Sequence, residues 1–105
     1  MFVETEARPV GEPAKVGTLK LSEAMRIGAR DTKQCSGVWW DGQGSFCALG
    51  AAYKGMGGDL SNAYGPSTLR ERFGLSHSMF ADIAHRNDSG ESRESIADWL
   101  ESQGL

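Results

Sequence analysis

The chain has little cysteine and no long run of apolar residues. Its 105 residues include two cysteines, Cys35 and Cys47, and its first residues lack the basic and apolar pattern of a secretory signal. Disulfides persist mainly in oxidising compartments, so we expect two reduced thiols and a cytoplasmic protein. No apolar run approaches the roughly 20 residues that span a bilayer, so no membrane-spanning helix is expected.

Positive charge is also in short supply. The sequence has 11 Lys and Arg residues against 14 Asp and Glu residues, which gives a formal net charge of -3 at pH 7. Duplex DNA and anionic membranes attract basic surfaces, so this charge disfavours a general binder of either. Hydrophobic residues make up 39% of the chain and charged residues 24%, which is the composition of a folded globular protein.

Helical patterns occupy most of the chain after residue 17. Residues 1–17 contain Pro and Gly without apolar periodicity, which predicts an extended or mobile N-terminal arm. We expect residues 18–105 to form a single helical domain of the mainly α class, a compact bundle of about five short helices. The helices are predicted over residues 18–29, 46–56, 66–73, 77–86 and 93–102.

The second of these segments has the pattern of a central, buried helix. Residues 46–56 are apolar almost all round, and Ser45 is placed to cap the N-terminus. Small residues lie close to one stripe, which would let another backbone approach closely. They are Cys47, Gly50, Ala51 and Gly55.

Residues 37–46 interrupt the helical patterns. Val38, Trp39 and Trp40 favour extended structure, and the following Asp-Gly pair is a turn signal, so a short β-like hairpin is expected. Adjacent residues of a strand point to opposite sides, which would turn Trp39 or Trp40 outward as an interface anchor. The favoured interpretation, however, is that both tryptophans pack into the core.

Candidate sites for catalysis or metal binding are weak. Cys47 lies near a helix N-terminus, where a thiol can become nucleophilic, but His77 and His85 are the only histidines and neither has a pattern that would present it to a cysteine. A packed core cysteine is the favoured interpretation. The spacings of 12, 30 and 8 residues along Cys35, Cys47, His77 and His85 lack the close pair of a zinc site, and no phosphate-loop motif is present. No metal, cofactor or catalytic residue is predicted.

The last two helical segments have the outline of a helix-turn-helix. The helices would cover about residues 77–86 and 93–102, with Ser92 and Arg93 near the bases. The second helix carries Glu94, Asp98 and Glu101, however, and duplex DNA would repel an acidic recognition helix. Two packed helices with a solvated acidic face are therefore favoured.

Five segments of the chain, taken in order, carry a resemblance. They are KLSEAMRIGA (20–29), CALGAA (47–52), TLRERF (68–73), RND (86–88) and SRESIADWLE (92–101). Over roughly residues 18–102, the chain resembles a group of small phage and prophage proteins, most of them without an assigned activity. Anti-CRISPR inhibitors of type I systems are among the small, acidic, helical phage proteins of this size.

This resemblance implies a phage-encoded, non-enzymatic protein-binding inhibitor in the bacterial cytoplasm, of the anti-CRISPR kind. Its partner would be a protein or ribonucleoprotein complex, such as a type I surveillance complex, whose basic DNA channel would be blocked by an acidic helical face. A helix-turn-helix regulator is the alternative, followed by a cysteine enzyme or a phage structural component. The predicted partner contacts are Glu91, Glu94, Asp98, Glu101, Trp39, Trp40, Arg70 and Arg72.

Overall fold

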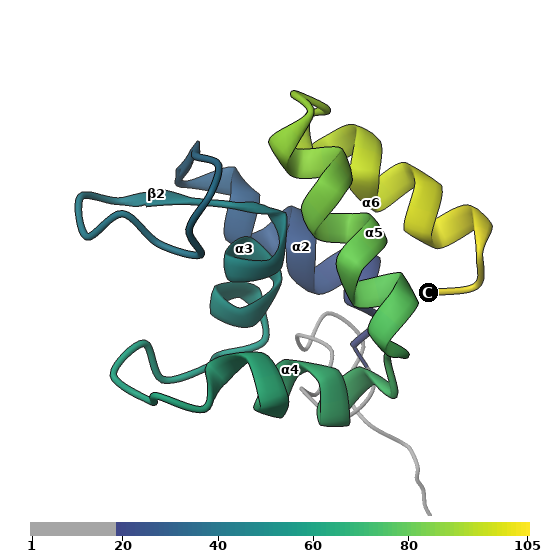
Figure 1. Ribbon diagram of the computed structural model, residues 1–105, viewed down its shortest axis with the longest axis horizontal. Helices are drawn as coiled ribbons and strands as arrows, with labels where there is room; N and C mark the ends of the chain where they lie inside the picture. The colour runs from purple at the N-terminus through teal and green to yellow at the C-terminus, as the bar shows by residue number, and fades with distance from the viewer. Residues whose placement is uncertain (1–18) are drawn as a thin grey trace, which may run out of the picture.

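The computed structural model describes residues 19–105, so the arm predicted over residues 1–17 lies outside the described residues. The fold is mainly helical, as predicted, with two very short strands (Figure 1). Within residues 19–105, no helix combines the length and the apolar character needed to cross a membrane. The elements in chain order are α2 (Leu21–Arg30), β1 (Lys33–Gln34), β2 (Ser45–Phe46), α3 (Ala48–Gly55), α4 (Gly65–Phe73), α5 (His77–Asp88) and α6 (Arg93–Ser102).

Helices α2 and α3 pack backbone against backbone. A Cβ atom added to Gly28 would lie 1.7 Å from the carbonyl oxygen of Ala51, and one added to Gly55 would lie 1.8 Å from that of Ala24. Only glycine permits such an approach at these two positions, because real Cβ atoms essentially never lie within 3.0 Å of another heavy atom. The prediction that the small residues of α3 admit a neighbouring backbone is therefore confirmed, and α2 is that neighbour.

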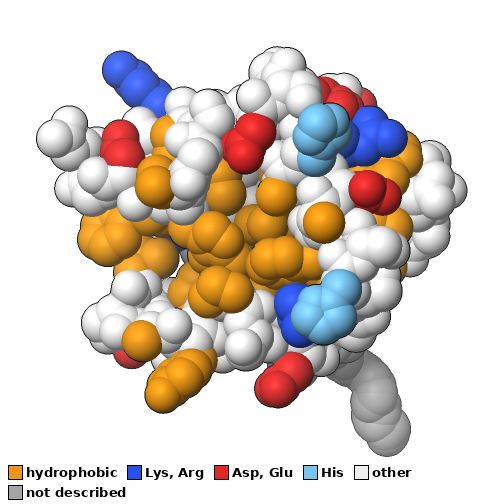
Figure 2. Space-filling view, viewed as in Figure 1, with side chains coloured by type: hydrophobic (Ala, Val, Ile, Leu, Met, Phe, Trp, Pro, Cys, Tyr) orange, Lys and Arg blue, Asp and Glu red, His pale blue; other side chains and the backbone are white. Residues whose placement is uncertain are grey.

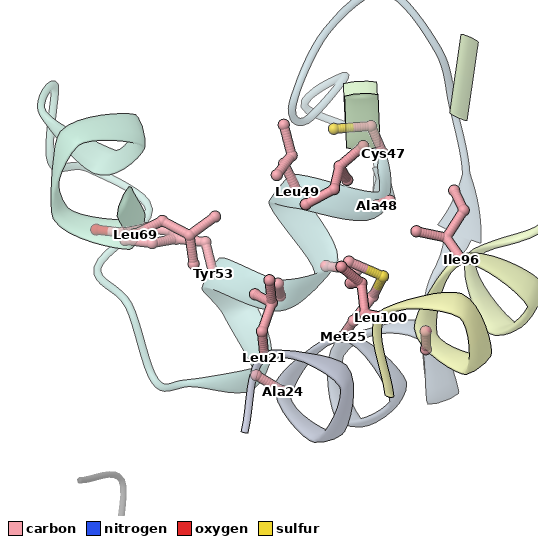
Figure 3. Packing of buried hydrophobic residues seen from close by; sticks show 14 of the residues in the cluster. Leu21, Ala24, Met25, Cys47, Ala48, Leu49, Tyr53, Leu69, Ile96 and Leu100 are labelled. Atoms are coloured by element: carbon pink, nitrogen blue, oxygen red, sulfur yellow. The ribbon is translucent and has the colours of Figure 1, made fainter. Parts of the chain in front are cut away.

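One hydrophobic core joins the helices. In Figure 1, α3 lies near the middle, with α2 beside it, α5 and α6 next to each other on the right and α4 below. Large side chains from the surrounding helices converge on the small residues of α3 (Figure 3). The core residues labelled there are Leu21, Ala24, Met25, Cys47, Ala48, Leu49, Tyr53, Leu69, Ile96 and Leu100.

The segment between α2 and α3 forms the expected hairpin, but the hairpin is shorter than predicted. Trp40 makes an antiparallel bridge with Phe46, and the Asp41 carboxylate accepts hydrogen bonds from the amides of Gln43 (2.7 Å) and Ser45 (3.1 Å). The sequence did not predict the second pairing, in which β1 lies parallel to β2 with Gln34 opposite Phe46. Two residues are too few to show the alternation by which a strand is recognised.

Side-chain caps begin three of the helices. Ser76 and Ser92 accept hydrogen bonds from backbone amides of α5 and α6, as predicted. The prediction that Ser45 caps α3 is wrong, because Ser45 belongs to β2 and the helix begins two residues later than such a cap requires. Cys47 is the cap instead, and its sulfur accepts a hydrogen bond from the amide of Gly50 at 3.4 Å.

Candidate binding groove at Trp39

Two open pockets flank the side chain of Trp39 and together form what we call the Trp39 groove. The first pocket, of about 130 Å³, lies between the segment preceding β2 and helix α5, and the second, of about 260 Å³, lies between that segment, α3 and the start of α4. Figure 2 shows apolar side chains gathered over this hollowed face. The first pocket is lined by Gly37, Val38, Trp39, Cys47, Leu49, Phe80, Ala84, Asn87 and Asp88, and the second by Trp39, Trp40, Tyr53, Leu60, Asn62, Gly65 and Pro66.

Aromatic contacts hold Trp39 in place as the ridge between the pockets. Its ring meets Tyr53 of α3 edge-on, with centroids 5.7 Å apart, and lies 6.2 Å from the ring of Phe80 on α5. Aromatic pairs at these separations stabilise one another beyond the area that they bury. Trp39 therefore links three segments and leaves a hollow on each side.

The apolar side chains that remain exposed concentrate at this groove. Trp40 is 44% exposed and stacks on Phe46, while Val38 is 52% exposed and Leu60 is 39% exposed. The favoured interpretation, that both tryptophans pack into the core, is therefore wrong for Trp40, which faces outward. Tyr64, more exposed still, directly precedes the groove residue Gly65. Exposed apolar groups gathered around one hollow are typical of binding sites.

A buried asparagine fixes one wall of the groove. Asn87 is 2% exposed, and its side-chain oxygen, Oδ1, accepts hydrogen bonds from the backbone amide of Ala48 and the side chain of Gln34, each at 2.9 Å. Its amide nitrogen donates to the carbonyl of Cys35 at 2.8 Å. Asn87 therefore ties α5 to the start of α3 and to the segment after β1. Helix α5 continues to Asp88, two residues beyond the predicted end at residue 86, and so includes Asn87.

A buried arginine, Arg93, supports the segments that lead into and out of the groove wall. Arg93, 5% exposed, directs its guanidinium group at the Thr32 side chain and at the backbone carbonyls of residues 29, 32, 33 and 46. Burial away from water lowers the pKa of Arg93. A guanidinium engaged in this way is not available to a base of DNA, so Arg93 does not have the position that the helix-turn-helix prediction gave it.

The two thiols are not activated. Burial raises the pKa of both Cys35 and Cys47, and the charge of Asp88 acts in the same direction. The charge of Arg93 opposes this shift at Cys35, and the backbone amides at the start of α3 oppose it at Cys47, but burial is the largest cause at both thiols. The two histidines are exposed on α5 and do not line the groove with Cys47. Among residues 19–105, no three His, Cys, Asp or Glu side chains are grouped as metal ligands.

The predicted acidic face lies on α6, away from the groove. Asp98 and Glu101 each accept a hydrogen bond from Arg26 of α2 at 2.7 Å, and Glu91 pairs with Arg86 at 3.0 Å. Glu94 is exposed, and no ion pair with another described residue engages it. Arginine neighbours therefore offset much of the negative charge on this face.

Arg70 and Arg72 lie at a third place on the molecule, apart from the groove and the acidic face. Both lie on α4, where Arg70 lines a separate hollow beside Gly74 and Arg72 lies over the ring of Phe73 at 5.7 Å. The structure thus brings Trp39 and Trp40 together at one site but places the acidic face and these arginines elsewhere.

Comparison with protein-family models, with curated proteins and with solved structures found no match to this chain.

Proposed function

We propose that this chain is a non-enzymatic binding protein that takes an apolar segment of a protein partner into the Trp39 groove. The observation that carries the proposal is the gathering of exposed Val38, Trp40 and Leu60 around two hollows separated by Trp39. Aromatic anchors in water-excluding hollows supply much of the energy of protein interfaces. The protonated thiols and the lack of a histidine beside Cys47 in the groove support binding over covalent catalysis.

The rigid surroundings of the groove support this proposal as well. Asn87 and Arg93 anchor the segment that carries Trp39 and Trp40 through buried hydrogen bonds. A site held in shape before binding loses less conformational entropy when the partner arrives. The groove therefore suits recognition of a defined segment.

In the phage setting that the sequence resemblance implies, the proposed partner is a subunit of a type I CRISPR surveillance complex. Binding would then block access of target DNA to the complex. The acidic face of α6 is a second candidate surface for the same partner, because Glu94, Asp98 and Glu101 follow one another at helical spacing and are exposed. Such a stripe would suit a Lys- and Arg-rich channel.

Site-specific photo-crosslinking would test which surface binds. We would place a benzophenone side chain at Leu60, in the groove, and at Ile27, an exposed apolar position of α2 outside it, in cells that contain an active type I system. The proposal expects crosslinks to one surveillance-complex subunit from position 60 and none from position 27. Equal crosslinking from both positions, or none from either, would overturn it.

The acidic face needs a separate test. Replacing Glu94 and Asp98 with Lys reverses the charge of the stripe, and the doubly substituted protein would be compared with the unaltered chain in an affinity pull-down of the surveillance complex. If the doubly substituted chain fails to recover the complex, while the chain with benzophenone at position 60 and unaltered Glu94 and Asp98 still crosslinks to it, both surfaces bind. Unchanged recovery would remove the acidic face from the proposal.

A further inference from the structure

One charged side chain lies among the apolar residues of the Trp39 groove. Of the described residues that line its two pockets, Asp88 alone carries a charge, and it lies in the smaller pocket with Val38 and Phe80. Its carboxylate is exposed. Burial is the main cause of the raised pKa of Cys47 in the same pocket, and the negative charge of Asp88 adds a small contribution. The groove is therefore apolar with one anionic end.

Hydrogen bonds fix the direction of this carboxylate without neutralising it. The Oδ1 atom of Asp88 accepts from the amide of Gly37 at 3.1 Å and from the buried side chain of Asn87 at 3.4 Å. No Lys or Arg among residues 19–105 forms an ion pair with it. A carboxylate has about four acceptor sites on its two oxygens, so capacity for a further donor remains.

We propose that the groove recognises an apolar or aromatic side chain that is followed in the partner by Lys or Arg, with the cation paired to Asp88. This inference rests on the proposed function and narrows it to a basic, apolar protein segment. Charge complementarity carries the choice, because an acidic residue at the same position of the partner would face Asp88 and be repelled. The smaller pocket, of about 130 Å³, suits an aromatic ring, since a cavity of about 150 Å³ holds benzene.

Three small probes of matched shape test this recognition by NMR on the full, 15N-labelled chain. They are 2-phenylethylammonium, 2-phenylethanol and phenylacetate, which share the ring and differ in charge. All three are expected to shift the indole NH signal of Trp39, which lines the smaller pocket together with Asp88. The ammonium is expected to bind about threefold more tightly than the alcohol, as an exposed ion pair allows, and phenylacetate more weakly than either.

Two variants on the same helix show whether Asp88 is the cause. Asp88→Asn keeps an oxygen for the amide of Gly37 and removes the charge, so the preference for ammonium over alcohol should disappear. Asp82→Asn removes an exposed charge of α5 that does not line the groove and should leave the preference intact. Should Asp88→Asn disturb the fold, the unaltered chain still tests the inference, because salt should reduce the preference.

The outcomes separate this inference from the proposed function. If the alcohol shifts the Trp39 indole signal but ammonium has no advantage, the role of Asp88 is overturned and the apolar groove remains. The same holds if the advantage persists in Asp88→Asn or is unaffected by salt. If none of the three probes shifts the Trp39 indole signal, the proposed function itself fails.

Discussion

Helix α3 takes part in two interfaces of opposite character. Toward α2 it packs through glycine and alanine, with Gly28 and Gly55 so close to the opposing backbone that no side-chain atom fits between them. Toward α5 and the segment before β2 it presents Leu49 and Tyr53, and these larger groups leave hollows. One helix thus supplies a closed interface for stability and an open one available for binding.

The difference shows that an open interface needs another means of support. Close packing holds α2 against α3. At the groove, the one such close approach of backbone to backbone among the described residues is that of Gly50 to the carbonyl of Trp39, and hydrogen bonds from Asn87 and Arg93 hold the rest of the wall. Such bonds are directional, so they can fix the backbone of the wall without filling the space beside it. The cost is that two polar side chains must be buried, and the Nε atom of Arg93 has no hydrogen-bond partner among the described residues.

The largest expected effect comes from placing a larger side chain in the tight interface between α2 and α3. Gly28→Val would force a side chain into the carbonyl of Ala51, and we expect a loss of about 3 kcal/mol or more in the free energy of unfolding, at the upper end for overpacking. Urea denaturation followed by circular dichroism would measure it. Ile27→Val, at the neighbouring exposed position, is the control and should change stability by less than about 0.5 kcal/mol. Equal losses in the two variants would show that α2 and α3 are not closely packed.

Removing the polar support should be the next largest effect. Arg93→Met keeps the length of the side chain but leaves buried carbonyls without donors, so we expect a loss of about 2–3 kcal/mol in the free energy of unfolding. The loss should be accompanied by faster amide hydrogen exchange at Cys35 and Cys47, whose amides bond to carbonyls of this region. A variant as stable as the parent, with unchanged exchange, would contradict the supporting role of Arg93.

The thiols give a smaller, kinetic test of the same region. Since burial raises the pKa of Cys35 and Cys47, the reactive thiolate should be scarcer near neutral pH than in a free cysteine and should increase only at higher pH. Iodoacetamide labelling, followed by mass spectrometry, should be slower for the native chain than for the chain in urea. Rapid native labelling of Cys47 at neutral pH would instead favour a cysteine enzyme.

The smallest expected effect is on the acidic face. Arg26→Ala removes the partner of Asp98 and Glu101, and because these ion pairs are exposed we expect a loss of less than about 1 kcal/mol that decreases with added salt. Denaturation at low and high salt would measure it. A loss comparable to that of Arg93→Met would mean that this face stabilises the fold as strongly as the buried network does.

The sequence predicted the helices better than the site. Capping serines and apolar periodicity locate α5 and α6 because both signals are local. The roles of Asn87 and Arg93 were missed, although each lies on the buried stripe of its helix, Asn87 four residues after Ile83 and Arg93 three before Ile96. A polar residue on an apolar stripe signals a buried network, but its partners come from segments far along the chain. The groove was missed for the same reason, since α3, α4, α5 and the Trp39 segment form it together.

The most direct test of the central claim is the recovery of surveillance-complex subunits by a chain carrying both Trp40→Ala and Leu60→Ser, compared with one carrying Ile27→Ala. All three positions expose apolar surface, but only Trp40 and Leu60 line the groove. The account predicts that the groove variant remains folded by circular dichroism and loses the complex, while the Ile27 variant recovers it fully. Full recovery by the folded groove variant would contradict the account.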